Sequence, residues 1–260
     1  KIENITFLSL TNKTEQIPKN TITLGINIDS QLKAIKKYLD DNNFSKTLLL
    51  IPKSEFEDQI TTVVQNNKFN FYKIFSYDTN PKNITNEIEK ITFYQERKRD
   101  LERRIKILED SNLEENKREL DKLKQKYTLG KVDFDSVIIA DFGERLKSVL
   151  TSFRFSDVTN KDVSFFTLNQ WFDESLFYED SMENLFFPSI NQENFNEFRK
   201  RYFDIFNHMA SEISVLAYDG TALIYYAWIN NKTKFNMKKL KTLDGFKGYS
   251  GHFMIKNNLS

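Results

Sequence analysis

The chain has 260 residues, enough to bury a substantial core in one large domain or in two lobes. Its 38 lysine and arginine residues nearly balance its 37 aspartate and glutamate residues, so net charge gives no reason to expect a nucleic acid or an anionic membrane as the main partner. Cysteine is absent, which excludes disulfides, thiolate metal sites and a cysteine nucleophile, and no apolar run approaches the about 20 residues of a membrane-spanning helix.

The first part of the chain alternates between short apolar runs and helix-periodic segments. Strands are predicted at 5–10, 21–26, 47–51 and 69–76. Asp29 or Ser30 is expected to cap a helix that runs to residue 42. Ser54 and Glu57 predict a capping box at the start of the next helix.

A highly charged segment at 84–127 interrupts this alternation. Leu101, Ile105 and Leu108 recur at helical spacing, and residues 110–112 then break the run. A second apolar stripe follows at Leu113, Leu120, Leu123 and Tyr127. Because nearly every position between the stripes is charged or polar, the segment predicts an antiparallel helical hairpin on the surface of another structure.

Strands and helices alternate again after the hairpin. Strands are predicted at 136–140, at 163–168 and at 185–190, where Pro188 breaks the last of them. Helices are predicted at 144–153, 192–206 and 212–230, and a β-hairpin at 245–255. Apolar strands separated by helices imply a doubly wound parallel sheet that is covered on both faces. We expect residues 1–25 and 191–260 to share one lobe, and 26–190 to form the other lobe with the hairpin inserted.

Motifs of nucleotide, metal and acyl-transfer chemistry are missing from the sequence. Neither glycine-rich phosphate-binding motif occurs, and there is no G-x-S-x-G turn. His208 and His252 lie far apart and not at the spacing of metal ligands. We therefore expect no cofactor, no metal ion and no enzymatic activity.

The expected carboxyl ends of the strands hold the candidate binding residues. Asp141 and Glu144 flank the end of one strand, where open α/β sheets bind ligands. Glu144 also fits the preference for an acid at a helix N-terminus, whereas Asp141 is a candidate for the cleft. Phe56, Phe142 and Trp171 each follow a predicted strand and would project into one crevice, although core packing is the competing explanation in a chain with 24 phenylalanines.

Several segments in this order carry a resemblance to a known family. They are 5–9, 23–26, 48–52, 129–141, 183–188 and 214–223. Together they resemble the type I periplasmic-binding proteins of the leucine-binding group. A charged helical hairpin directly before a Leu-Gly-x-x-x-Phe-Asp strand is similar to the penicillin-binding protein activator branch of that group.

The resemblance implies a periplasmic-binding-protein-like α/β fold of two lobes, with the first lobe incomplete in this chain. It also implies the ligand positions, which are Ser9, Thr11 and Asn12 in a first-lobe loop and Phe56, Phe142 and Trp171 in the second lobe. Amino-acid receptors hold the ligand ammonium with an acid, and Asp141 is the evident candidate here.

Two functions are compatible with this resemblance. The first is a non-enzymatic regulator that activates a peptidoglycan synthase by direct contact, with the hairpin as a contact arm. The second is a receptor that closes two lobes over an amino acid or similar solute in the interlobe cleft and delivers it to the permease of an ABC importer. Both imply a periplasmic protein, and a lipid anchor would come from a preceding segment.

Overall fold

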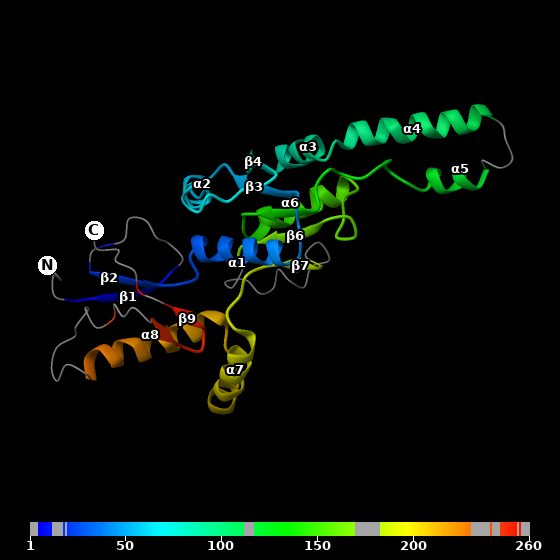
Figure 1. Cartoon of the computed structure of the whole chain (residues 1–260). Coiled ribbons are helices and arrows are strands. Elements are labelled where there is room, and N and C mark those ends of the chain that lie inside the picture. Colours follow the sequence, from blue (N-terminus) through cyan, green and yellow to red (C-terminus); the bar gives the residue numbers. More distant parts are fainter. Residues whose placement is uncertain are drawn as a thin grey trace. The chain divides into compact units, whose positions relative to one another are not determined.

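A computed structural model describes residues 5–11, 18, 20–111, 117–169, 183–229, 240, 245–253 and 255. The chain divides into two compact units (Figure 1). Unit 1 comprises Lys1–Gln31 and Pro188–Ser260, and unit 2 comprises Leu32–Phe187. None of the helices described is both long and apolar enough to cross a membrane.

Unit 2 is built on a parallel sheet of five strands in the order β4-β3-β5-β6-β7. The strands are β3 (Thr47–Pro52), β4 (Lys73–Tyr77), β5 (Ser136–Ile139), β6 (Ser164–Thr167) and β7 (Leu185–Phe186). The chain adds β4 on one side of β3 and β5 on the other, so the topological switch point lies between β3 and β5. The predicted strand 185–190 is wrong in length, because β7 ends at Phe186, two residues before Pro188, which has no backbone N–H to donate.

Helices cover both faces of this sheet, as the sequence predicts for a doubly wound fold. Val137 and Phe165 are neighbours in register and pack in the core cluster that α3 (Pro81–Ile91) and α6 (Gly143–Phe155) complete. Ile138 and Phe166 point to the opposite face, since side chains alternate along a strand. There Tyr38 of α1 (Ile28–Asp41) lies 5.7 Å from Phe166 between ring centroids.

Two predicted helix caps are wrong. The start of α1 is capped by Asn27, whose Oδ1 accepts a hydrogen bond from the Ser30 amide at 2.8 Å, rather than by Asp29 or Ser30. The helix α2 (Glu57–Asn66) has Phe56 at its N-cap and no side-chain cap. Glu57 is therefore the first helical residue, two positions too early to close a capping box with Ser54.

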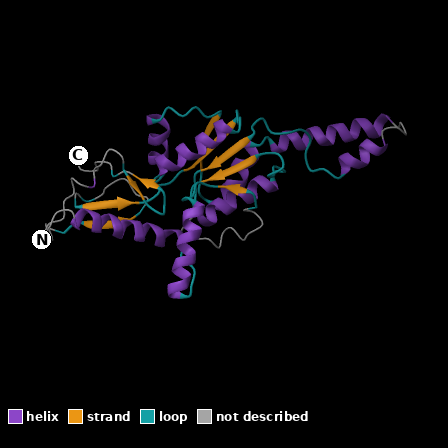
Figure 2. Ribbon diagram, turned by 60° about the horizontal axis from the view of Figure 1, so that its bottom comes forward, coloured by secondary structure: helices purple, strands orange, loops and turns teal. Residues whose placement is uncertain are grey.

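The charged segment 84–127 contains three helices rather than two. Residues 81–91 form α3, which packs against α6 as part of the lobe. Phe93 then takes a left-handed conformation with φ of 52°, and α4 (Tyr94–Ser111) starts after it. The hairpin proper pairs α4 with α5 (Lys117–Lys124), as Figures 1 and 2 show.

The α4–α5 hairpin has a small core of its own. Leu101, Leu108 and Leu123 are buried together, with Ile105, Leu120 and Leu129 packed partly against them. Ion pairs cross between the helices, from Arg104 to Glu119 at 2.8 Å and from Lys124 to Glu109 at 2.7 Å. The predicted stripe fails at Tyr127, which is 74% exposed, and Leu113 lies outside the described residues.

A buried arginine holds the base of this hairpin against the rest of unit 2. Arg97 donates from Nε to the Thr92 carbonyl at 3.0 Å and from a terminal nitrogen to the Ser156 carbonyl at 2.5 Å. Burial lowers the pKa of Arg97, while the nearby Asp157 carboxylate opposes that change. The Leu129 amide donates to the Arg97 carbonyl at 3.0 Å, so the two ends of the hairpin lie side by side.

Unit 1 joins a parallel strand pair to two long helices. The pair is β1 (Phe7–Leu10) and β2 (Thr21–Leu24), and the helices are α7 (Gln192–Phe206) and α8 (Glu212–Ile229). A short antiparallel pair, β8 (Phe246–Lys247) and β9 (His252–Phe253), forms the predicted β-hairpin. A Cβ at Gly220 would lie 2.5 Å from the Leu8 Cδ2, so the glycine lets α8 approach β1 closely.

Candidate ligand-binding site

The switch point of the unit 2 sheet brings two of the predicted aromatic residues together. Phe56 follows β3 and Phe142 follows β5, the two strands at which the order reverses. Their ring centroids are 5.8 Å apart at an angle of 63°, and both side chains are half-buried. The two rings are thus in contact, whereas their place in a common crevice stays a prediction, and Trp171 lies outside the described residues.

Asp141 precedes Phe142 just after the end of β5 and is fully buried. Its carboxylate accepts from Arg145 Nε at 3.0 and 3.1 Å, and a terminal nitrogen of Arg145 lies 2.9 Å from Oδ1. The Phe142 amide donates to Oδ1 at 2.8 Å, and the Tyr77 hydroxyl donates to Oδ2 at 2.5 Å. Protein donors therefore already surround the acid that the sequence singles out.

The electrostatics of this cluster follow from burial and from the charge pair. Burial raises the pKa of the Tyr77 hydroxyl well above its usual range, and the neighbouring Asp141 charge adds to the effect. The hydrogen bond to Asp141 raises the pKa of Arg145. The Arg145 side chain is 40% exposed whereas that of Asp141 is buried, so this ion pair presents a positive charge to solvent.

Sequence reasoning missed Tyr77 and Arg145. Arg145 stands four residues after Asp141, the spacing at which an ion pair forms along the first turn of a helix. Tyr77 is 64 residues from Asp141, and only the pairing of β4 beside β3 brings it near. Glu144, by contrast, is 81% exposed and pairs with Lys147 at 2.9 Å, as expected of an acid in the first turn of α6.

The candidates in unit 1 lie at the end of β1. Ser9 pairs in register with Thr23 inside the strand pair, and Thr11 comes directly after β1. Both are half-buried, and Asn12 lies outside the described residues. No group of three or more histidine, aspartate and glutamate side chains that could hold a metal ion occurs in the part of the chain that the structure describes.

The solved structures that superpose on this chain include solute-binding proteins. An ABC transporter substrate-binding protein from Desulfitobacterium hafniense superposes with a TM-score of 0.62 at 11% identity, over 96% of this chain and 66% of its own. A leucine-binding protein from Thermotoga maritima gives 0.61 at 11% identity, over 98% and 66%. A branched-chain amino acid transporter substrate-binding protein from Streptococcus pneumoniae, in complex with isoleucine, gives 0.52 at 17% identity, over 93% and 61%.

The chain has the fold of these substrate-binding proteins. The predicted α/β architecture with periplasmic-binding-protein-like parallel sheets is thereby confirmed. At this identity the likeness shows the fold alone, and the chain spans about two thirds of the length of the first two structures named. No protein-family model and no curated protein matches the sequence.

Proposed function

We propose that this chain is a non-enzymatic substrate-binding protein of an ABC importer, located in the periplasm or outside the cell, for an amino acid or a similarly small solute. The single observation that carries this proposal is the aromatic pair of Phe56 and Phe142 at the sheet's switch point, where open α/β sheets bind ligands. The fold shared with substrate-binding proteins supports it, and one of those structures is in complex with isoleucine.

The charges of the cluster favour a particular orientation of the solute. The Asp141 oxygens already accept from Arg145, Tyr77 and Phe142, so this acid serves to position the guanidinium rather than to hold a ligand ammonium. Arg145 has five N–H donors, and those not directed at Asp141 can bind a ligand carboxylate. The two phenyl rings then contact the apolar part of the ligand.

A thermal-shift series tests this proposal. The probes are leucine, 4-methylpentanoate, which lacks the ammonium, and isoamylamine, which lacks the carboxylate. We expect leucine and 4-methylpentanoate to raise the melting temperature and isoamylamine not to, because a ligand that binds only the folded state stabilises it. The reverse order of the two analogues, or no response to any probe, would contradict the proposal.

A pair of variants tests whether the rise in melting temperature comes from binding at Phe142. Phe142→Ala should abolish the rise in melting temperature while the circular dichroism spectrum stays unchanged. Phe155→Ala is the matched control, since Phe155 ends the same helix and is 65% exposed. An equal loss in both variants would show that binding lies elsewhere.

Regulation of a peptidoglycan synthase by protein contact is the second candidate, and the α4–α5 hairpin favours it. The hairpin carries its own buried leucines and cross-helix ion pairs, and Arg97 fixes its base. This combination would make a rigid arm with a charged surface, which is suited to recognising a protein partner.

Removal of the hairpin separates the two candidates. Because the Leu129 amide bonds the Arg97 carbonyl, residues 99–126 can be replaced by a short Gly-Ser linker without moving either end. If solute binding is the function, the leucine response survives this replacement. If contact is the function, the replacement abolishes co-purification with a penicillin-binding protein of the same cell. Unchanged co-purification would contradict the hypothesis that the hairpin is a contact arm.

A further inference from the structure

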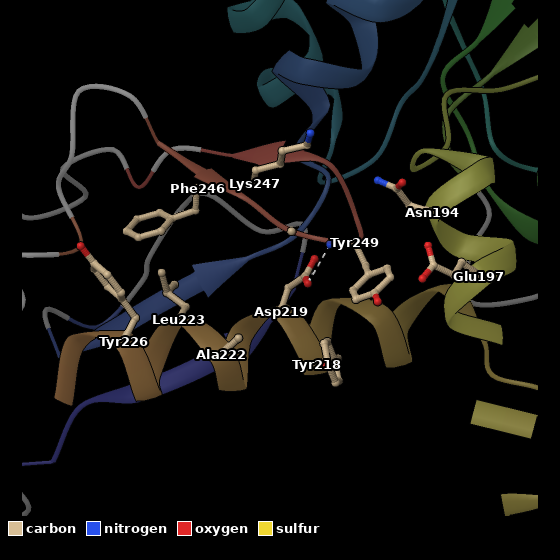
Figure 3. Close-up of a pocket in the computed structure, with 11 residues that line it drawn as sticks. Asn194, Glu197, Tyr218, Asp219, Ala222, Leu223, Tyr226, Phe246, Lys247 and Tyr249 are labelled. Atoms are coloured by element: carbon tan, nitrogen blue, oxygen red, sulfur yellow. Dashed lines mark hydrogen bonds between the residues drawn. The ribbon is translucent and has the colours of Figure 1, made fainter. Parts of the chain in front are cut away.

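A pocket of about 490 Å³ lies within unit 1. Its walls come from α7, α8 and the β8–β9 hairpin, as Figure 3 shows. Its lining includes four aromatic residues, Tyr218, Tyr226, Phe246 and Tyr249. A volume of this size suits a small organic molecule.

Asp219 supplies a buried carboxylate to the middle of this pocket, with 5% of the residue exposed. Its Oδ1 accepts from the Tyr249 amide at 3.0 Å, and its Oδ2 accepts from the Ser250 amide at 2.8 Å and the Ser250 hydroxyl at 2.5 Å. The turn passes so close to this carboxylate that residue 248 must be glycine, because a Cβ there would collide with Oδ2. Oδ1 keeps capacity for a further donor, since each carboxylate oxygen accepts about two hydrogen bonds.

Cationic side chains lie near this pocket but do not pair with Asp219 in the described part of the chain: Lys247 is in the lining, and Arg201 donates to the Tyr249 hydroxyl. No lysine or arginine there forms an ion pair with it. In Figure 3 the Lys247 ammonium points away from Asp219, and the Glu197 carboxylate on α7 points toward Tyr249. The lining therefore carries two carboxylates, Asp219 and Glu197, against the one ammonium group of Lys247.

The aromatic rings stand on either side of this carboxylate. Tyr218 and Tyr249 contact each other with centroids 5.7 Å apart, and Tyr226 and Phe246 do so at 5.6 Å. Figure 3 shows the second pair on one side of Asp219 and Tyr249 on the other. The face of an aromatic ring carries negative charge density, so it attracts cations as a carboxylate does.

We propose that this pocket binds a small organic cation, a substituted ammonium group with an apolar or hydroxyalkyl substituent. The ammonium lies near Asp219 and against the aromatic rings, and Glu197 adds a second negative charge from the α7 side. All of its lining residues belong to unit 1, whereas the proposed solute site is built from residues of unit 2, so variants can test each site by itself.

Calorimetric titration of the full chain with choline tests the inference. The comparison probe is 3,3-dimethyl-1-butanol, which has the same shape without the charge. We expect choline to bind and the neutral probe to bind about tenfold more weakly, because its ring and carboxylate contacts lose their electrostatic part. Equal affinity for both probes, or no binding of choline, overturns the proposal.

A charge-neutral variant of the rim locates the site. Asp219 is unsuitable because it holds the hairpin turn, whereas Glu197 is exposed, and Glu197→Gln removes only its charge. We expect this variant to bind choline about threefold more weakly, as one exposed carboxylate contributes modestly. Glu193→Gln, on the first turn of α7 and outside the pocket lining, should leave affinity unchanged. An equal effect of the two variants overturns the assignment.

Discussion

Replacing Arg145 with methionine should lower the free energy of unfolding, because Asp141 would stay buried without the guanidinium. The Asp141 carboxylate is fully buried, and Arg145 is the residue that pairs with its charge, through contacts of 2.9 to 3.1 Å. In the Arg145→Met variant that carboxylate keeps the Tyr77 hydroxyl and the Phe142 amide among its donors but loses the guanidinium. Uncompensated buried charge is among the most destabilising changes in a folded protein.

The magnitude follows from the geometry. Two unit charges about 3 Å apart at an effective dielectric of about 20 attract by about 5 kcal/mol. Water reaches the guanidinium, whose side chain is 40% exposed, and screens part of this attraction. We therefore expect the variant to lose about 2–3 kcal/mol in its free energy of unfolding.

Urea denaturation of five proteins, the wild type and four variants, checks this value. Asp141→Asn combined with Arg145→Met should be less destabilised than the sum of the two single variants, because the neutral amide no longer needs the cation. Arg103→Met is the matched control, since its pair with Asp100 at 3.4 Å is exposed and should contribute less than about 0.5 kcal/mol. Strict additivity, or a loss for Arg145→Met no larger than for the control, would refute the reasoning.

Three further predictions rest on other parts of the chain. Gly220→Ala should lower the free energy of unfolding by about 1–3 kcal/mol, because its Cβ would meet Leu8 Cδ2 at 2.5 Å, and Leu8→Ala in the same chain should restore part of that loss. Burial opposes ionisation of Asp135, but hydrogen bonds from the Ser45 and Lys46 amides outweigh it and lower its pKa below 3.8. The stabilisation from Asp135 is thus present above pH 3.8 and lost as the pH falls through the folded pKa. The urea midpoints of wild type and Asp135→Asn should therefore differ more at pH 7 than at pH 3. A difference in midpoint that stays constant with pH would contradict this. Arg97→Met should remove the arginine donors of the buried Thr92 and Ser156 carbonyls and so make the α4–α5 hairpin more sensitive to limited proteolysis. Arg99→Met should not have this effect, because the Arg99 side chain is 66% exposed.

Local signals located most elements of the fold. The predicted helix 192–206 coincides with α7, and the predicted strand 47–51 lies within β3. Hydrophobic periodicity and chain-breaking residues act over a few positions, so sequence alone carries this information. The predicted helix caps were wrong because the cap depends on which neighbouring polar group reaches the first amides of the helix. For α1 that group is the Asn27 side chain.

The sequence by itself therefore determined the element order, the parallel α/β class and the existence of a charged hairpin. Only the tertiary structure decided what the candidate residues contact. Strand order placed Phe56 beside Phe142, and Tyr77 reaches Asp141 across 64 residues. Asp219 likewise holds a turn some 30 residues further along the chain. The physical reason is that hydrogen bonds and ion pairs depend on distances in space, and strand pairing and helix packing set those distances between residues that are remote in sequence.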